Sequence, residues 1–245
     1  MKSHKNPLWD RYVEHIAKKY GKRYLDSFRY QTECFRLHRI PLEGKRVLDI
    51  GGGDGRYSFY MAAAGAREVI CLEPELAGSS EGMIASFEET KRQLNLPCVH
   101  LVISTFQEYK PDAPFDILFS NNHLDEEACI HLKHSKQAQE VYRQLFDKMH
   151  DMLRPGGYLV IYDASRYCFY SILGLRNPFA PTIEWHKHQT PWFWSRFAQA
   201  SGFRKVHQKW SHPYRFHRIG HLLIGNPAVN FFWKSQFVII LQRQD

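Results

Sequence analysis

Carboxylates and glycines crowd one short stretch of this sequence, and they are residue types that could hold a nucleoside-bearing ligand. Residues 47–55 read VLDIGGGDG, so an apolar run passes directly into the glycines. Such a run is typical of a strand that is buried on both faces, and glycines let the backbone turn sharply beside a ligand. The helix expected over residues 56–64 would offer unpaired backbone N–H groups at its start. The residues that we predict to bind the ligand here are Asp49, Gly51, Gly52, Gly53 and Gly55.

The charges around this turn favour one kind of ligand over another. A dinucleotide-binding turn would carry another glycine where this sequence has Arg56, and it would bind a pyrophosphate. Here a phosphate would meet the carboxylates of Asp49 and Asp54, whereas a cationic amino-acid group would be attracted by them. The next apolar run, residues 68–72, ends at Glu73, whose carboxylate can accept hydrogen bonds from two ribose hydroxyls. We therefore predict a ligand that carries both a ribose and a cationic group.

Two further motifs extend this pattern and complete a family resemblance. Residues 115–122 read FDILFSNN, and residues 153–161 read LRPGGYLVI. Together with the glycine turn and Glu73, they resemble the class I, Rossmann-like S-adenosylmethionine-dependent methyltransferases over residues 45–163. The resemblance implies S-adenosyl-L-methionine as the cofactor and a transferase that carries out methylation. It also implies cofactor contacts from Thr105, Phe106 and Asn121.

The resemblance also implies an α/β fold, with a seven-stranded, mostly parallel sheet, an antiparallel last strand and helices on both faces. Residues 8–40 carry apolar side chains at helical spacing, and we expect them to form a helical lid within a single methyltransferase domain over residues 1–245. Residues 45–163 would be the cofactor-binding core. In an open parallel sheet, ligands bind outside the carboxyl ends of the strands. The segments 164–189 and 211–234 leave from such ends, so we expect them to build the acceptor pocket.

The local patterns set the expected elements along the chain. Expected strands cover residues 47–50, 68–72, 99–103, 115–122, 205–210 and 236–241, with a fifth strand entered through 153–161. Beyond the lid and residues 56–64, we expect helices over residues 138–153 and 191–201, the first of them ended by Gly156 and Gly157.

Histidine is the side chain best suited to remove a proton from a hydroxyl acceptor near neutral pH. His123 follows the fourth expected strand, where the family holds acceptor-orienting groups. His186 and His188 lie in the sequence EWHKHQ between two prolines, and in an extended segment they would point to the same side as Glu184. We name His123, His186 and His188 as candidate catalytic bases, while a packing or capping role explains each of them equally well. We predict no metal site, because H-x-H lacks a third placed ligand.

The residues after the fourth expected strand bear on the acceptor. Methyltransferases that act on nitrogen often carry N-P-P-Y or D-P-P-Y there, whereas this sequence reads SNNHL. We therefore predict O-methylation of a hydroxyl group on a small molecule or a glycan precursor. One alternative is an RNA or nitrogen methyltransferase that uses a basic surface. Another is a catalytically silent cofactor-binding module that serves a partner.

Composition limits the class of protein. The chain has 245 residues, of which 44% are hydrophobic, a normal content for one α/β domain. Its net charge of +8 would attract polyanions, yet charged faces are usually solvated surface, so a nucleic-acid partner is possible but not favoured. The 5 cysteines include no C-x-x-C pair, which favours a reduced, cytoplasmic setting. No apolar run reaches the roughly 18 residues of a membrane span, and the N-terminus lacks the apolar core of a secretory signal.

Overall fold

The computed structural model divides the chain into two compact units. One comprises Met1–Lys110 with Phe115–Ile117, and the other comprises Pro111–Pro114 with Leu118–Asp245. The structure describes residues 7–34, 37, 40–75, 81–121, 136–181, 183–185, 188–211 and 225–245.

The strands of the described residues form one seven-stranded sheet in the order β3-β2-β1-β4-β5-β7-β6. Their bounds are β1 Arg46–Ile50, β2 Glu68–Leu72, β3 Val99–Val102, β4 Phe115–Asn121, β5 Leu153–Ala164, β6 Phe203–Trp210 and β7 Gln236–Arg243. β1, β2 and β3 pair in parallel, whereas β7 is antiparallel to both β5 and β6. The expected fold class, with its antiparallel last strand, is confirmed.

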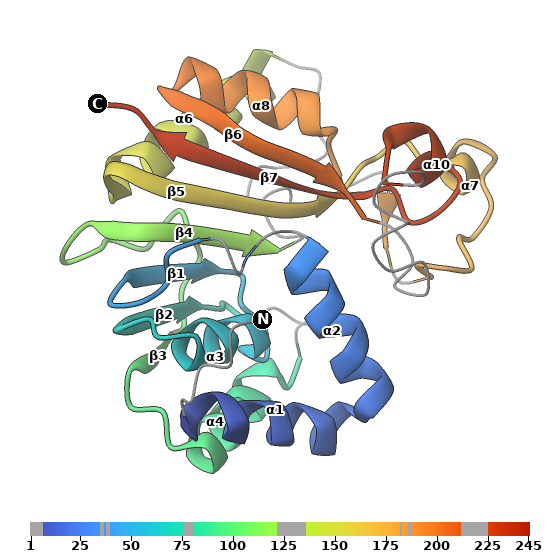
Figure 1. Cartoon of the computed structure of the whole chain (residues 1–245). Helices are drawn as coiled ribbons and strands as arrows, with labels where there is room; N and C mark the ends of the chain where they lie inside the picture. The colour runs from blue at the N-terminus through green and yellow to red at the C-terminus, as the bar shows by residue number, and fades with distance from the viewer. Residues whose placement is uncertain are drawn as a thin grey trace. The chain divides into compact units, whose positions relative to one another are not determined.

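The helices of the first unit lie on one side of its three parallel strands (Figure 1). Its helices are α1 Pro7–Tyr20, α2 Lys22–Cys34, α3 Arg56–Ala63 and α4 Met83–Leu94. Every residue of β1 is buried, the charged Arg46 and Asp49 included, as expected for a strand covered on both faces. The helices expected within residues 8–40 are α1 and α2, which are separated at Gly21, whose positive φ of 87° suits glycine, and their role as a lid stays a prediction. Tyr12 of α1 packs its buried ring beside the rings of Phe28 in α2 and Tyr60 in α3, so these helices share one aromatic core.

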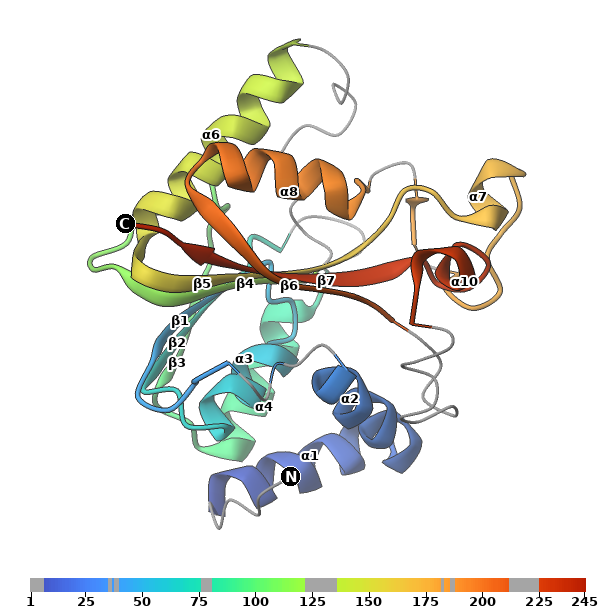
Figure 2. The same ribbon diagram turned by 45° about the horizontal axis from the view of Figure 1, so that its top comes forward.

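The second unit sets α6 Lys136–Met152 and α8 Pro191–Ala200 along the antiparallel strands β5, β7 and β6 (Figure 2). The expectation that Gly156 and Gly157 end the first of these helices is wrong, because α6 ends at Met152 and both glycines lie within β5. Arg243 of β7 supplies the physical reason. Its Nη1 donates to the carbonyl of His150 at 2.9 Å and to that of Leu153, so it satisfies carbonyls at the helix end.

α8 begins at residues whose types favour a helix start. The hydroxyl of Thr190 accepts a hydrogen bond from the backbone N–H of Phe193 at 3.2 Å, and Pro191 occupies the first turn. Trp194 is then fully buried and packs beside Tyr142 and Phe146 of α6. Two short helices, α7 Phe169–Ile172 and α10 Pro227–Phe231, complete the described part of this unit.

Candidate functional site

The glycine turn that follows β1, residues 51–55, is hydrogen-bonded to the end of β2. Gly51, Gly53 and Gly55 have φ angles of 66°, 57° and 77°, which side chains disfavour. The backbone N–H groups of Gly51 and Gly52 donate to the carbonyl of Leu72 at 2.8 and 3.1 Å. The sequence therefore uses glycine where the backbone conformation requires it, and the turn is held in one shape.

Glu73 completes this turn from the carboxyl end of β2. Its Oε2 accepts from the N–H of Gly53 at 2.9 Å, and its Oε1 accepts from the N–H of Glu75 at 3.0 Å. Glu73 is buried, yet each carboxylate oxygen can accept a further hydrogen bond. A pair of ribose hydroxyls needs two such acceptors, so the donor and acceptor set fits a nucleoside-bearing cofactor.

Gly52 is required for space and not for its backbone angle. A Cβ atom there would lie 2.4 Å from Cys71 Sγ and 2.9 Å from Asp49 Oδ2. Around Gly53, by contrast, the atom of the described residues that a Cβ would meet within 4 Å is Met83 Sδ, at 3.8 Å. The turn is therefore tight against the strands on one side and roomier at Gly53, which agrees with a ligand that approaches the backbone there.

Asp49 lies beneath the turn. It is buried, and its Oδ2 accepts a hydrogen bond from Ser58 Oγ of α3 at 2.6 Å. Burial raises the pKa of the Cys71 thiol, and the carboxylate of Asp49 raises it further. Asp49 thus joins β1 to α3, and a contact between Asp49 and the cofactor stays a prediction.

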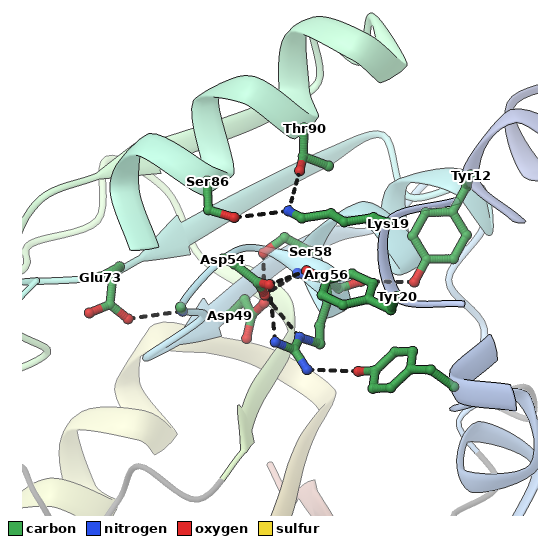
Figure 3. Close-up of polar contacts among 12 residues, drawn as sticks. Tyr12, Lys19, Tyr20, Asp49, Asp54, Arg56, Ser58, Glu73, Ser86 and Thr90 are labelled. Atoms are coloured by element: carbon green, nitrogen blue, oxygen red, sulfur yellow. Dashed lines mark hydrogen bonds and ion pairs between the residues drawn. The ribbon is translucent and has the colours of Figure 1, made fainter. Parts of the chain in front are cut away.

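Asp54 does not present a free carboxylate to a cationic ligand, and that part of the sequence interpretation is wrong. The cation that pairs with Asp54 is Arg56, two residues along the chain. Its Nε lies 2.9 Å from Asp54 Oδ1 and its Nη2 lies 3.0 Å from Oδ2 (Figure 3). The hydroxyl of Tyr20 in α1 donates to Asp54 Oδ2 as well. Arg56 Nη1 donates to the hydroxyl of Tyr24 in α2 at 2.7 Å. We call Asp54, Arg56, Tyr20 and Tyr24 the Asp54 clasp.

The clasp joins the lid helices to the turn. Burial alone raises the pKa of Asp54, but the guanidinium of Arg56 and the hydroxyl of Tyr20 outweigh it and hold that pKa below its ordinary value. Burial and the bond to Asp54 raise the pKa of Tyr20, so it stays a hydroxyl donor at neutral pH. Lys19 adds a second connection, since its Nζ donates to Ser86 Oγ at 2.8 Å and to Thr90 Oγ1 at 2.9 Å in α4 (Figure 3).

The remaining residues predicted to bind the cofactor lie in different settings. Thr105 is half-buried, and its Oγ1 donates to Glu108 Oε2 at 3.0 Å. Phe106 is fully buried, so its ring packs in the interior of the first unit. Asn121 is the last residue of β4 and is half-buried. Cofactor contacts from these three residues stay predictions.

His188 is the candidate base that the structure describes, and it is paired with a carboxylate that the sequence reasoning missed. Its Nδ1 lies 2.8 Å from Asp163 Oδ1, near the end of β5. The other oxygen, Oδ2, accepts from Trp194 Nε1 at 3.0 Å, and the N–H of Ala164 donates to Oδ1 at 2.7 Å. His188, Asp163 and Trp194 are all buried, so the imidazole is held in a fixed orientation. The position of Asp163 near the carboxyl end of a strand was the available signal.

The sequence EWHKHQ was expected to be extended, and for its described residues this expectation is wrong. The N–H of His188 donates to the carbonyl of Trp185 at 3.2 Å, a bond typical of a turn and not of an extended segment. Glu184 is exposed, whereas His188 is buried beside Asp163, so Glu184 is not the carboxylate that orients it. His123 and His186 lie outside the described residues.

Within residues 7–245, apart from the gaps given above, no group of three or more histidine, cysteine or acidic side chains is placed to hold a metal ion. In the same part of the chain, no helix combines the length and apolar character needed to cross a membrane.

Comparison with known proteins identifies a family model and several relatives. A model described as a methyltransferase domain matches residues 9–208. A tRNA U34 carboxymethyltransferase from Syntrophotalea carbinolica is 33% identical over 125 residues, which is 51% of this chain and 33% of that protein. A protein of the same name from Citrifermentans bemidjiense is 32% identical over 133 residues, 54% of this chain and 36% of that protein. The match therefore spans about one third of the length of these curated relatives.

Solved structures agree with the fold. An S-adenosylmethionine dependent methyltransferase from Mesorhizobium loti has a TM-score of 0.59 at 18% identity, covering 87% of this chain and 98% of that chain. One from Aquifex aeolicus has a TM-score of 0.58 at 17% identity, covering 94% and 97%. At these identities the likeness is one of fold.

Proposed function

This chain belongs to the class I S-adenosylmethionine-dependent methyltransferases, and from that premise we propose that it transfers a methyl group to an oxygen atom of a tRNA. The observation that carries this acceptor is the shared name of the curated relatives, tRNA U34 carboxymethyltransferase, over about half of this chain. The net charge of +8 is consistent with a polyanionic acceptor. The comparisons thus shift the preference away from the small molecule or glycan precursor that the sequence alone favours.

The cofactor would be held by the first unit. We propose that the backbone of the glycine turn and the carboxylate of Glu73 bind it, because Glu73 retains acceptor capacity beyond its bonds to Gly53 and Glu75. The bound cofactor supplies an electrophilic methyl group on a sulfonium centre. The chain itself then has to orient the acceptor, exclude water and remove a proton from an acceptor hydroxyl.

We propose His188 as the group that removes this proton. Asp163 accepts the hydrogen bond of Nδ1–H, which leaves Nε2 as the nitrogen that would take the proton from the acceptor. The buried carboxylate would then stabilise the imidazolium ion that forms. In this proposal Asp163 is a positioning residue, and Trp194 holds its second oxygen.

A second candidate keeps the same donor and base but uses a small hydroxyl compound or a glycan precursor. The specific observation in its favour is the His188–Asp163 pair, which suits any hydroxyl acceptor. In addition, about half of this chain lies outside the match to the tRNA-modifying relatives.

The test supplies S-adenosylmethionine with a radioactive methyl group, together with total tRNA, ribosomal RNA, sugars or phenols in separate reactions. We expect label in tRNA, with binding to tRNA that weakens steeply as salt rises. We expect His188→Ala to lower kcat by about 100-fold or more, while the affinity for S-adenosylhomocysteine is unchanged.

The other outcomes are equally specific. Label in sugars or phenols and none in tRNA would establish the second candidate. Tight binding of S-adenosylhomocysteine without label in any pool would indicate a catalytically silent module. A His188→Ala variant with normal kcat would remove His188 as the base and return attention to His123 and His186.

A further inference from the structure

The second unit exposes aliphatic side chains on one short turn. Ile172, Leu173 and Leu175 are 60%, 55% and 55% exposed, and Phe179 follows at 39%. Residues 172–176 are exposed without interruption and read ILGLR. We call Ile172, Leu173, Leu175 and Phe179 the apolar tip. Isolated exposed apolar residues are ordinary, but a contiguous group of this kind marks a binding surface.

The apolar tip is carried by a well-built scaffold. Asn177, which is buried, donates from Nδ2 to the carbonyl of Trp233 at 2.7 Å, and its Oδ1 accepts from the N–H of Phe179 at 2.8 Å. The rings of Phe179 and Trp233 lie 4.0 Å apart between centroids. In both ribbon views α7 and α10 lie side by side (Figures 1 and 2), and the rings of Phe169 and Phe232 are 5.1 Å apart. The exposed side chains are therefore presented by packed structure.

Basic residues accompany the apolar tip along the two described segments that carry it. Residues 165–181 and 225–235 contain no aspartate or glutamate, whereas they contain Arg166, Arg176 and Lys234. Arg176 directly follows the aliphatic turn and is exposed. Phe232, on the adjoining segment, adds a further ring that is 56% exposed. The exposed cation of Arg176 beside apolar side chains complements a surface that is apolar inside and anionic outside, whereas Arg166 and Lys234 are half-buried and Glu184, which follows this segment, is exposed.

We propose that the apolar tip inserts into the surface of an anionic lipid membrane. Leucine, phenylalanine and basic residues together are the side chains that place a protein in the interfacial region of a bilayer. Leucine is under-represented among the residues that carry protein–protein affinity, which favours lipid over a protein partner as the occupant. This inference is independent of the acceptor.

The test is flotation of the purified 245-residue chain with vesicles of phosphatidylcholine containing about one third phosphatidylglycerol. We expect the protein to float with these vesicles and to bind pure phosphatidylcholine vesicles much more weakly. Leu173→Asp should lower the partition coefficient at least ~tenfold. Val206→Asp is the matched control, because Val206 is exposed on β6 and lies outside the apolar tip.

A second pair of variants tests the role of charge. Arg176→Gln should lower binding to the anionic vesicles about fivefold and leave binding to neutral vesicles unchanged. Arg204→Gln is its control, since Arg204 is an exposed residue of β6. Circular dichroism and thermal unfolding would check that each variant is folded.

Three results would overturn the proposal. The first is a wild-type protein that stays with the unbound fraction, and the second is a Leu173→Asp variant that floats like the wild type. The third is a dimer in light scattering that Leu173→Asp converts to a monomer, without vesicle binding by either protein. That last result would make a second copy of the chain the occupant of the apolar tip.

Discussion

Glu73 has the clearest single-residue role in the first unit. Its carboxylate is buried and already accepts the N–H groups of Gly53 and Glu75. Glu73→Ala should lower the affinity for S-adenosylhomocysteine at least ~tenfold and lower the free energy of unfolding by about 1–3 kcal/mol, because buried N–H groups lose their acceptor. Titration calorimetry and urea unfolding measure the two effects. Glu88→Gln, on the exposed side of α4, is the control, and an unchanged affinity in Glu73→Ala would contradict this role.

Gly52 offers a test of close packing under the turn. Gly52→Ala would bring a methyl group against Cys71 Sγ and Asp49 Oδ2, and such overpacking costs about 1–3 kcal/mol of stability. We also expect cofactor affinity to fall, since the turn must shift. Adding Cys71→Ala removes the nearer atom and should restore part of both losses, as measured by urea unfolding and calorimetry. If the double variant is no better than Gly52→Ala, the steric explanation fails.

Residue types and spacing predicted the turn, but they could not predict which side chains pair. Asp54 lies among glycines, and from sequence alone its carboxylate is as available to a ligand as that of Asp49. The structure pairs it with Arg56 and Tyr20, which depends on where α1 lies in space. The same holds for His188: Glu184 is near in sequence, whereas Asp163, 25 residues away, is near in space.

At the scale of elements, the strands were predictable because buried strands consist of short runs of mainly apolar residues. β2 has the bounds that its sequence indicates, and β7 begins where expected at Gln236. The helix α4 was not anticipated, although its buried residues Phe87, Thr90 and Leu94 have helical spacing. The sequence did not predict where α6 ends, because Arg243 hydrogen-bonds to carbonyls at that end. Arg243 is about 90 positions away in the chain, so a rule based on neighbouring residues cannot anticipate it.

The Asp54 clasp makes a prediction about α1 and the glycine turn, because Tyr20 and Arg56 meet at one carboxylate. Asp54 has a pKa below its ordinary value in the folded protein, so its contribution to stability is full above the unfolded pKa of about 3.9 and is lost as pH falls through the lower folded pKa. Asp54→Asn should cost about 2 kcal/mol near pH 6, and the difference from the wild type should narrow below about pH 3.

Urea unfolding at a series of pH values measures this difference. Tyr20→Phe removes the hydroxyl and keeps the carboxylate, so it should cost less and keep the pH dependence that Asp54→Asn loses. Hydrogen exchange in α1 should become faster in both variants, because each loosens the bond between α1 and the turn. A constant difference between Asp54→Asn and the wild type across this pH range would contradict the ionised pairing.

At the scale of the whole molecule, the chain has two compact units whose strands belong to one sheet. A shared sheet predicts a single cooperative unfolding transition, with cofactor binding in the first unit stabilising all of it. S-adenosylhomocysteine at about 100 times its Kd should add ~2.7 kcal/mol of stability, because it binds the folded state alone. For a chain of this size that corresponds to a rise in Tm of roughly 5–10 °C. Calorimetric melting with and without ligand measures the shift, and Gly52→Ala should show a much smaller one. Two transitions, of which the ligand moves one, would instead show that the units unfold independently.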